Sequence, residues 1–400
     1  MTNSGSSSNG SRGAPQQPIP FNRPSITDKE RQAALDALAN AHQSGDGPYT
    51  RACSALLERA LGTRRCLLTT SCTHALEMMG LLGNLEAGDE VVVPSFTFVS
   101  TANAFALRGA KVVFADIRPD TLNLDESRLE EVLTPRTRAV VVVHYAGVAC
   151  EMDAIVDITR PRGIPIWEDN AHGLFGRYRG RNLGTLGAMS AQSFHETKNF
   201  SAGEGGALLL NDSSLIDRAE IIREKGTNRS RFFRGLVDKY SWVDLGSSYL
   251  PAELLAAVLH AQLERREEIQ RRRRELWTRY FDALSGWAEA NEVRLPHVPE
   301  HCEQTYHMFY VLLPSLEQRQ DLMGYLRERS IHSVFHYLPL HLSEMGRSLG
   351  GFEGMCPVTE SVSDRLLRLP MYTDLTDEDQ DRVIDAVTSA IPAALRSSIR

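Results

Sequence analysis

Residues 193–206 read SFHETKNFSAGEGG, and this stretch decides how the rest of the chain is interpreted. It overlaps the end of a predicted strand, Ala188 to Phe194, and leads into another, Ala207 to Leu210. Lys198 stands between an aromatic-flanked histidine and a glycine cluster. A lysine in a partly dry pocket has a lowered pKa and can act as a nucleophile. The pattern fits a solvated surface loop equally well, because glycine mostly marks turns with positive φ.

Short apolar strands alternate with helices on the N-terminal side of this stretch. The further predicted strands are Cys66–Leu68, Glu90–Val93, Lys111–Ala115, Ala139–Val143 and Ile164–Trp167. The predicted helices are one that begins at a Thr27/Glu30 capping box, and Arg51–Leu61, His74–Leu82 and Phe98–Leu107. Several strands are continuously apolar, which is typical of strands covered on both faces. The pattern therefore predicts an α/β domain with a mostly parallel sheet.

Polar residues follow the carboxyl ends of these strands. They are Thr69–Thr73, Pro94–Phe98, His144-Tyr145, Glu168-Asp169 and His195–Lys198. In open α/β sheets, ligands bind beyond the carboxyl ends of the strands. The sequence therefore predicts that these segments form one site.

The C-terminal part has a different organisation. A loop rich in arginine and aromatic residues, Thr227 to Trp242, precedes a predicted long helix from Pro251 to about Leu284. Its Arg271–Arg274 run lies four residues after Glu267 and Glu268, which favours an ion-paired helix face over a nucleic-acid patch. Shorter elements follow, namely His307–Leu313, Leu322–Arg329 and Asp377–Ala386. We predict a disordered tail (1–20), a large domain (21–250), and a linking helix with a small α+β domain (251–400).

Composition narrows the class of protein. The 400 residues are 42% hydrophobic and 24% charged, as in an ordinary soluble globular protein, and the net charge of −7 argues against a general nucleic-acid binder. Six scattered cysteines form no CxxC pair, which indicates reduced thiols in a cytoplasmic protein and no zinc site. No apolar run approaches the roughly 20 residues that span a bilayer.

Two of the strand ends suggest specific chemistry. Ser71-Cys72-Thr73 at a helix start offers hydroxyl and N–H groups to an anion such as phosphate, although simple helix capping gives the same pattern. Asp169 at the mouth of a buried strand needs a positive partner, such as a protonated ring nitrogen, unless it caps a following helix. His144 and His195 also lie near strand ends, where either a structural or a catalytic role is possible.

Longer stretches carry a resemblance to a known family. They are Pro94–Phe105, Val143–Asp153, Ser193–Lys198, Glu220–Arg234 and Phe335–His341. From about Pro20 to Ala390 the chain resembles the sugar-nucleotide aminotransferases, in particular those that form dTDP-4-amino-4,6-dideoxygalactose. These are pyridoxal-phosphate enzymes of the aspartate-aminotransferase fold (fold type I). The resemblance implies a mostly parallel mixed sheet in the large domain and a smaller α+β C-terminal domain.

The resemblance also implies roles around pyridoxal 5'-phosphate. Lys198 would bind the cofactor covalently and move protons, and Asp169 would keep the pyridine nitrogen protonated. The other cofactor-binding residues implied are Cys72, Thr73, Phe98, His172 and Ser193, and no metal is implied. His172 stands where many relatives have Gln. Ser241 aligns with an Asn that reaches the cofactor phosphate of the partner subunit in some relatives, which puts that contact in doubt.

The implied substrates are dTDP-4-dehydro-6-deoxy-D-glucose and L-glutamate as amino donor. Arg229 and Arg234 suit the diphosphate, because guanidinium groups match phosphate oxygens, but they also fit a solvated loop. His336, Tyr337 and His341 suit the sugar, and a homodimer with shared active sites is implied. The amine at carbon 4 is axial (galacto) or equatorial (gluco). The alternatives are another ketosugar nucleotide as substrate, or a non-catalytic regulatory relative that binds sugar nucleotides.

Overall fold

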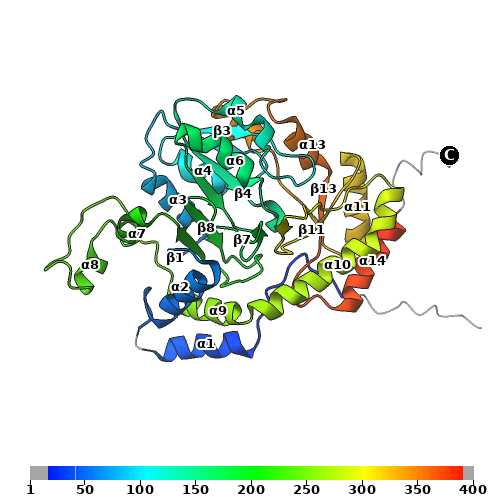
Figure 1. Cartoon of the computed structure of the whole chain (residues 1–400). Helices are drawn as coiled ribbons and strands as arrows, with labels where there is room; N and C mark the ends of the chain where they lie inside the picture. Colours follow the sequence, from blue (N-terminus) through cyan, green and yellow to red (C-terminus); the bar gives the residue numbers. More distant parts are fainter. Residues whose placement is uncertain (1–16, 41, 391–400) are drawn as a thin grey trace, which may run out of the picture.

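The largest element is a seven-stranded sheet, seen in a computed structural model that describes residues 17–40 and 42–390 (Figure 1). Its strand order is β1-β9-β8-β5-β4-β2-β3. The bounds are β1 Arg65–Thr69, β2 Glu90–Pro94, β3 Lys111–Ala115, β4 Thr137–Val143, β5 Ile166–Asp169, β8 Met189–Ser193 and β9 Gly206–Leu210. β9 pairs antiparallel with both of its neighbours, β1 and β8, and the other neighbouring strands of this sheet pair in parallel. The mostly parallel mixed sheet is confirmed.

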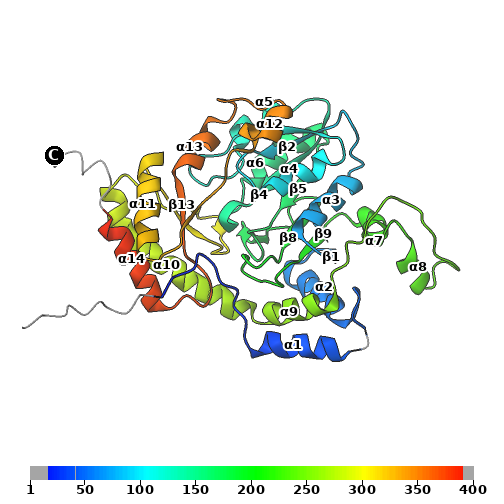
Figure 2. The same ribbon diagram turned by 180° about the vertical axis from the view of Figure 1, so that it is seen from behind.

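Helices cover both faces of this sheet (Figures 1 and 2). Val91 and Val93 join a core on the side of α3 (Cys72–Leu82) and α4 (Val99–Ala106). The intervening Val92 joins a second core with α6 (Met152–Thr159). Successive side chains of a strand point to opposite faces of the sheet, so a strand that is apolar at every position needs helices packed on both faces.

Each strand predicted in this region is present, with small changes at the ends. β5 begins at Ile166 instead of Ile164, because Pro165 has no N–H to donate to the ladder, although its carbonyl accepts from Val140. The Thr27/Glu30 capping box at the start of α1 (Asp28–Ala39) is also confirmed. Residues 1–16 of the predicted tail lie outside the described residues.

The single helix predicted from Pro251 to Leu284 is wrong. The chain forms α9 (Glu253–Glu264) and α10 (Arg266–Ala290), which meet at Arg265 with φ −90° and ψ 10°. The buried Arg265 guanidinium donates to Glu30 at 2.8 Å and to Glu268 at 2.8 Å. These bonds hold the bend, so that α9 lies along α1 and α2 (Pro48–Leu61) while α10 runs away to the second sheet (Figure 1).

A second, three-stranded antiparallel sheet has the order β11-β13-β12, with bounds Phe309–Leu312, Leu366–Leu369 and Val334–Phe335. It packs with α10, α11 (Leu316–Glu328) and α14 (Asp377–Ser389) around its own apolar core. Ile19 belongs to this core, and residues 17–27 run from there to α1, which lies against α9. The exact boundary between the two parts, at residue 250, stays a prediction.

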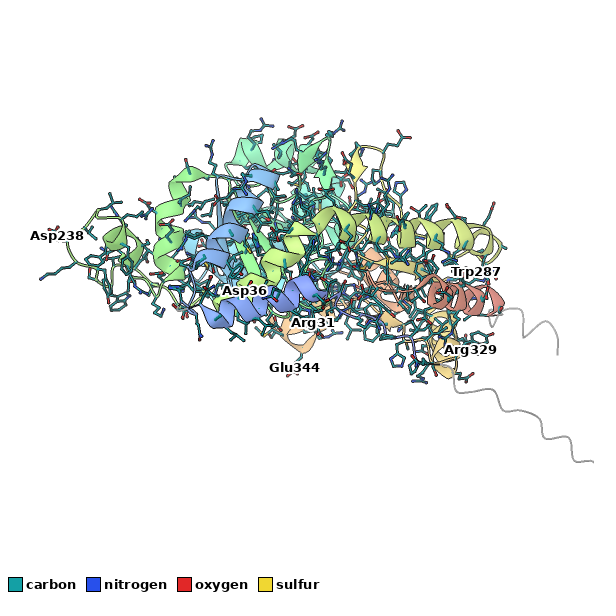
Figure 3. The ribbon with its side chains drawn as sticks, turned by 90° about the horizontal axis from the view of Figure 1, so that it is seen from below. Arg31, Asp36, Asp238, Trp287, Arg329 and Glu344 are labelled. Atoms are coloured by element: carbon teal, nitrogen blue, oxygen red, sulfur yellow. The ribbon has the colours of Figure 1, made fainter. Side chains whose placement is uncertain are left out.

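The remaining elements are smaller. A third sheet contains β10 (Cys302–Glu303), β6 (Arg177–Tyr178) and β7 (Arg181–Asn182). The short helices are α5 Leu129–Val132, α7 Ile216–Arg223, α8 Arg229–Phe233, α12 Glu344–Ser348 and α13 Pro357–Arg365. α8 and the loop after it project far from the body, and Asp238 lies at their tip (Figure 3). Among the described helices, none combines the length and apolarity needed to cross a membrane.

Candidate active site

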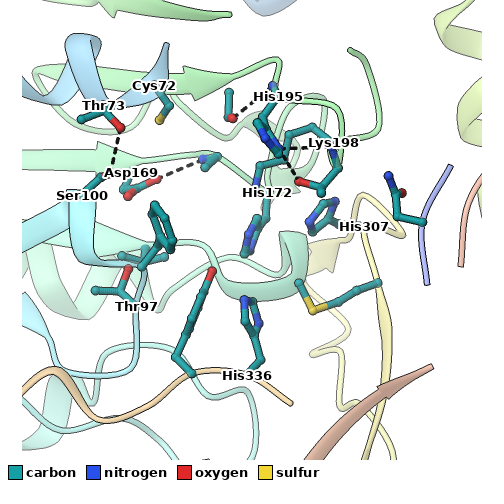
Figure 4. Close-up of a pocket in the computed structure, with 18 of the residues that line it drawn as sticks. Cys72, Thr73, Thr97, Ser100, Asp169, His172, His195, Lys198, His307 and His336 are labelled. Atoms are coloured by element: carbon teal, nitrogen blue, oxygen red, sulfur yellow. Dashed lines mark hydrogen bonds between the residues drawn. The ribbon is translucent and has the colours of Figure 1, made fainter. Parts of the chain in front are cut away.

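A cavity of about 610 Å³ lies at the carboxyl ends of the large sheet's strands, where the second sheet approaches them. The large sheet contributes Ser71, Cys72, Thr73, Phe98, Asp169, His172, Ser193 and Lys198 to its walls. The second sheet and the segments beside it contribute His307, His336, Tyr337 and Arg368. The predicted convergence of strand ends therefore occurs, and Figure 4 shows its two sides, with Thr73 and Asp169 facing the histidines.

The loop that carries Lys198 is anchored by buried residues on both sides of the lysine. Phe194 and Phe200 are fully buried in an apolar core with α2 and α9. The Phe194 N–H donates to the Gly205 carbonyl at 2.8 Å, and the Lys198 N–H donates to the His195 carbonyl at 2.9 Å. This is a constrained loop, which settles the alternative of a free surface loop.

The environment of Lys198 favours a neutral amine. Burial lowers the pKa of Lys198 to about 8, the charge of Asp169 opposes this shift, and the charge of Arg368 adds to it. With this pKa, about a tenth of the amine is unprotonated at pH 7, far more than for an ordinary lysine, and an unprotonated amine can attack a carbonyl carbon.

Asp169 is a buried carboxylate at the end of β5. Its Oδ2 accepts from Thr101 Oγ1 at 2.7 Å, and its Oδ1 accepts from the Ala171 N–H at 3.1 Å. Thr101 donates to Asp169, so Thr101 accepts from Thr97, whose hydroxyl lies 2.8 Å away. Burial nevertheless raises the pKa of Asp169. No helix begins after Asp169, so the capping alternative is excluded, and a cation in the cavity would favour its ionised form.

Anion-binding groups stand on the opposite side of the cavity from the histidines. Ser71 caps α3 by accepting from the His74 N–H at 3.1 Å, and Thr73 Oγ1 lies 2.8 Å from Ser100 Oγ. The first turn of a helix leaves N–H groups without intrahelical partners and carries a partial positive charge. With Ser193 beside it in the cavity wall, this helix start suits a phosphate.

Three histidines form the facing wall (Figure 4). The rings of His172 and His307 stack with centroids 4.3 Å apart, and His336 Nδ1 lies 3.1 Å from the Tyr145 hydroxyl. Burial lowers the pKa of all three well below the usual value, and the charge of Lys198 lowers each further. The three rings are therefore neutral at pH 7.

The ring of His307 has a defined tautomer. Asn199 donates through Nδ2 to the Thr305 carbonyl at 2.8 Å and to Gln270 at 3.1 Å. Asn199 Oδ1 is therefore an acceptor, and His307 Nδ1, at 2.9 Å, carries the hydrogen. The other ring nitrogen of His307, Nε2, is then an acceptor.

His144 and Glu168 form a structural pair beneath the site. Cys150 N–H donates to His144 Nδ1 at 3.2 Å, so the hydrogen is on Nε2, which donates to Glu168 at 2.9 Å. Glu168 also accepts from the N–H groups of Gly184, Leu186 and Gly187. His144 is completely buried, with both ring nitrogens bonded, so the structure assigns it a structural role.

Three predicted substrate residues do not reach the cavity of their own chain. His341 is fully buried, with Ser95 Oγ 2.6 Å from Nδ1 and Glu360 2.9 Å from Nε2. Arg234 pairs with Glu220 at 2.6 Å, and the Arg229 guanidinium lies over the Phe233 ring. We withdraw His341 from the substrate-binding residues, because both of its nitrogens are engaged. The role of Arg229 and Arg234 stays a prediction, because neither lines the cavity of its own chain.

Sequence reasoning missed four residues of the site, which are Thr101, Asn199, His307 and Arg368. Arg368 did leave a signal, because it is the one charged residue in the apolar run of β13. Thr101, Asn199 and His307 left none, since their partners are distant in the sequence. In the part of the chain that the structure describes, no group of His, Cys, Asp and Glu is arranged to hold a metal ion.

Comparison with known proteins gives consistent matches along almost the whole chain. The profile of the DegT/DnrJ/EryC1/StrS aminotransferase family matches residues 25–388. The spore coat polysaccharide biosynthesis protein SpsC of Bacillus subtilis (strain 168) is 31% identical over 391 residues, which cover 94% of this chain and 98% of SpsC.

Two solved structures are also similar. The aminotransferase TlmJ from Streptoalloteichus hindustanus superposes with a TM-score of 0.85 at 32% identity, covering 96% of this chain and 100% of TlmJ. The PLP form of Spr1654 from Streptococcus pneumoniae, a candidate sugar aminotransferase, has a TM-score of 0.86 at 26% identity. That match covers 93% of this chain and 98% of Spr1654.

Proposed function

Because this chain belongs to the DegT/DnrJ/EryC1/StrS aminotransferase family, whose cofactor is pyridoxal phosphate, we propose that it aminates a deoxyketosugar nucleotide. The acceptor proposed is dTDP-4-dehydro-6-deoxy-D-glucose and the donor is L-glutamate. The product is dTDP-4-amino-4,6-dideoxy-D-galactose or its gluco epimer. The observation that carries the proposal is a lysine of lowered pKa in the same cavity as a buried aspartate that has no cationic partner within ion-pair distance among the described residues.

The cavity fits pyridoxal phosphate at each of its functional groups. The start of α3, with Cys72, Thr73 and Ser193, suits the phosphate. Asp169 is a buried acceptor that suits a protonated pyridine nitrogen. His172 Nδ1 is buried without a hydrogen-bond partner, and the phenolic oxygen of the cofactor would supply one. Phe98 is 58% exposed in the isolated chain, which leaves its ring available for stacking.

Two residues of this chain carry the proposed chemistry. When bound, pyridoxal phosphate supplies an electron sink for the carbon that bears the amine. Lys198 would hold the cofactor through its amine and would carry the proton that moves between carbon and nitrogen. Asp169 would favour a protonated ring nitrogen, and each pKa unit of this bias corresponds to about 1.4 kcal/mol.

The sugar is proposed to bind against His336 and Tyr337. Both line the cavity, and neutral imidazole and phenol groups exchange hydrogen bonds with hydroxyl and keto oxygens. The Tyr145 hydroxyl restrains His336 through Nδ1. Stereochemistry at carbon 4 depends on which face of the sugar lies toward Lys198.

A homodimer with shared sites is proposed from the projecting segment around α8. Its exposed apolar residues are Phe232, Phe233, Leu236, Tyr240, Trp242, Val243 and Leu245. Phe233 is 70% exposed and Trp242 is 76% exposed. A cluster of exposed apolar side chains of this kind is typical of a surface that another protein covers. A second copy of the chain would cover them and would receive Arg229 and Arg234 at its cavity. The cytoplasm is the proposed compartment, because the six cysteines form no disulfide.

The test uses the purified protein with pyridoxal phosphate, L-glutamate and the dTDP-ketosugar. We expect a yellow protein whose absorbance band is lost in Lys198→Ala, and an aminated sugar nucleotide among the products. Proton NMR then separates the epimers, since a small coupling at carbon 4 marks the axial amine. Colourless protein in the presence of cofactor contradicts the enzyme. Cofactor binding without amino transfer favours the non-catalytic relative, and transfer to another ketosugar alone changes the substrate.

A further inference from the structure

A second cavity, of about 350 Å³, lies where the two main sheets meet, and it shares no lining residue with the active-site cavity. Its walls come from the turn after β3 (residues 119–122), the segment after α10 (residues 294–297) and β11. Leu122, Leu295 and Leu312 give it an apolar lining. Small-molecule sites combine such a lining with a few placed polar groups, so the polar groups of this cavity decide what fits it.

One of these polar groups is the hydroxyl of Tyr310 on β11. Tyr310 is 4% exposed, and its hydroxyl makes no hydrogen bond to any residue that the structure describes. Burial raises the pKa of Tyr310, and the charges of Arg294 and Asp120, two other residues of the cavity wall, also act on it. The hydroxyl therefore faces the cavity. A buried hydroxyl without a partner is costly, so a ligand that accepts its hydrogen removes that cost.

A second polar group is the guanidinium of Arg294. It donates through Nη1 to the Pro119 carbonyl at 3.0 Å, and among the described residues no carboxylate lies within ion-pair distance of it. Arg365 is equally without an ion pair and flanks the end of the same strand, because Arg294 pairs with Leu312 and the Leu313 N–H donates to the Arg365 carbonyl. Burial lowers the pKa of Arg365, and the charge of Arg294 lowers it further. Two like charges this close favour the binding of an anion.

The one carboxylate in the cavity wall, that of Asp120, is already compensated. Arg118 donates to its two oxygens at 3.0 and 2.9 Å, and the Thr121 N–H donates to Oδ1 at 2.7 Å. Arg118 also pairs with Glu126, which does not line the cavity. The imidazole of His297 is a further lining group and makes no hydrogen bond within the described part of the chain. The cavity therefore presents hydrogen-bond donors that have no acceptor of their own.

We infer that this cavity binds the phosphate group of a small phosphomonoester whose ring or apolar body lies against the leucines. A phosphomonoester carries nearly two negative charges and three acceptor oxygens, which suit a guanidinium together with a hydroxyl donor. The site is separate from the catalytic one. The ring of Tyr310 lies 6.1 Å from that of Tyr145, whose hydroxyl is 3.1 Å from His336 Nδ1, so these two rings stand between the cavity and the histidine wall.

The test measures binding of phenyl phosphate, which joins a phosphate to a small ring and contains neither a sugar nor a nucleotide. It is titrated into holoenzyme, with pyridoxal phosphate bound, by isothermal calorimetry. We expect saturable binding with a dissociation constant of about 1 mM or lower. Phenol and inorganic phosphate each carry one part of the probe, so each should bind at least about tenfold more weakly.

Two variants remove the groups that recognise the phosphate. Arg294→Gln should weaken phenyl phosphate by about tenfold or more, because hydrogen bonds to charged groups are the strong ones. Tyr310→Phe keeps the ring and removes only the hydroxyl, and we expect a loss of about tenfold. The matched control is Arg329→Gln, because Arg329 lies over the Tyr325 ring and lines neither cavity. Arg368→Gln removes the arginine of the active-site cavity and should also leave the affinity unchanged.

Four outcomes overturn the inference. No saturable binding to wild-type holoenzyme means that the cavity takes no such ligand. Unchanged affinity in both Arg294→Gln and Tyr310→Phe, or a loss confined to Arg368→Gln, means that phenyl phosphate binds elsewhere. Phenol that binds as tightly as phenyl phosphate removes the role of the anion, and inorganic phosphate that does so removes the role of the apolar lining. Thermal unfolding of each variant shows that it is folded before affinities are compared.

Discussion

The Thr101 hydroxyl on α4 donates to the Asp169 carboxylate at the end of β5 across 2.7 Å. Thr97 donates in turn to Thr101, so two side chains from the segment after β2 orient one carboxylate of β5. Hydrogen bonds to an ionised carboxylate favour its charged form, which opposes the effect of burial on the Asp169 pKa.

Thr101→Val tests this relationship, because valine keeps the shape of threonine and removes the hydroxyl. The ionised carboxylate loses a charge-assisted bond, its pKa rises further, and we expect the affinity for pyridoxal phosphate to fall by about tenfold. Absorbance titration of the apoprotein gives the dissociation constant. The control is Thr159→Val, which removes a hydroxyl that donates to the Ile155 carbonyl far from the cavity. Equal affinities in wild type and Thr101→Val would contradict the role.

The pKa of Lys198 predicts how cofactor capture depends on pH. The neutral amine is the reactive form, so the rate at which apoprotein captures pyridoxal phosphate should rise with pH and level off above a midpoint near 8. Arg368→Gln should move that midpoint upward, because the charge of Arg368 helps to lower the pKa. Rapid-mixing absorbance measurements from pH 6 to 10 give both midpoints, and Lys198→Arg supplies the background without a reactive amine. A midpoint near 10 in wild type would contradict the buried environment.

The same shift has a consequence for the stability of the apoprotein. The folded-state pKa of Lys198 is lower than that of an unfolded chain, so the unfolded state binds more protons between about pH 8 and pH 10.5. The apoprotein should therefore become more stable relative to Lys198→Met as the pH rises through this window. Below it, the methionine variant should be the more stable, because it does not have to bury a protonated amine. Chemical denaturation at pH 7 and pH 10.5 measures the difference.

Local sequence pattern and long-range packing contributed differently to the site. Lys198, Asp169 and Thr73 were predicted because each follows a recognisable apolar strand, and parallel strands bring their carboxyl ends together. Arg368 and His307 come from the second sheet, whose approach to the first depends on contacts that no local pattern encodes. The bend at Arg265 escaped prediction for the same reason, because its partner Glu30 is 235 residues away.

His341 shows how a local run can mislead. It lies only four residues after Tyr337, and both were assigned to the sugar. The chain turns between them, so Tyr337 lines the cavity while His341 lies between Ser95 and Glu360. This arrangement ties the segment after β12 to the end of β2.

His341→Ala should therefore destabilise the protein without changing substrate recognition. The substitution opens a buried space and leaves the Ser95 hydroxyl without its partner, at a cost of about 2–4 kcal/mol. Chemical denaturation measures the loss, and KM for the ketosugar should stay at the wild-type value in protein that remains folded. His336→Ala is the matched comparison and should behave in the opposite way, with a raised KM and a smaller loss of stability. A raised KM in His341→Ala would return that histidine to the substrate-binding residues.

The proposed exchange of arms between subunits can be tested by complementation. If Arg229 acts on the partner's cavity, Arg229→Ala homodimers should bind the sugar nucleotide poorly, while Lys198→Ala homodimers should be inactive. In a mixed dimer of one Arg229→Ala chain and one Lys198→Ala chain, the cavity of the first chain has its own Lys198 and receives Arg229 from its partner. This dimer therefore has one complete site. Coexpression of two differently tagged chains and tandem purification should therefore yield dimers with close to half of the wild-type activity per dimer.

The control is the pair Lys198→Ala with Asp169→Ala, because both residues belong to one chain's cavity and no complete site can form from them. Activity in the Arg229 mixture that does not exceed that of the separate Arg229→Ala homodimers would contradict action in trans. The surface itself is tested by Trp242→Ser, which removes the most exposed apolar group of the arm and should shift the dimer toward monomer in light scattering. Phe352→Ser, an exposed apolar residue on the loop after α12, should leave the dimer intact. A Trp242→Ser dimer as stable as wild type would mean that this arm does not form the interface.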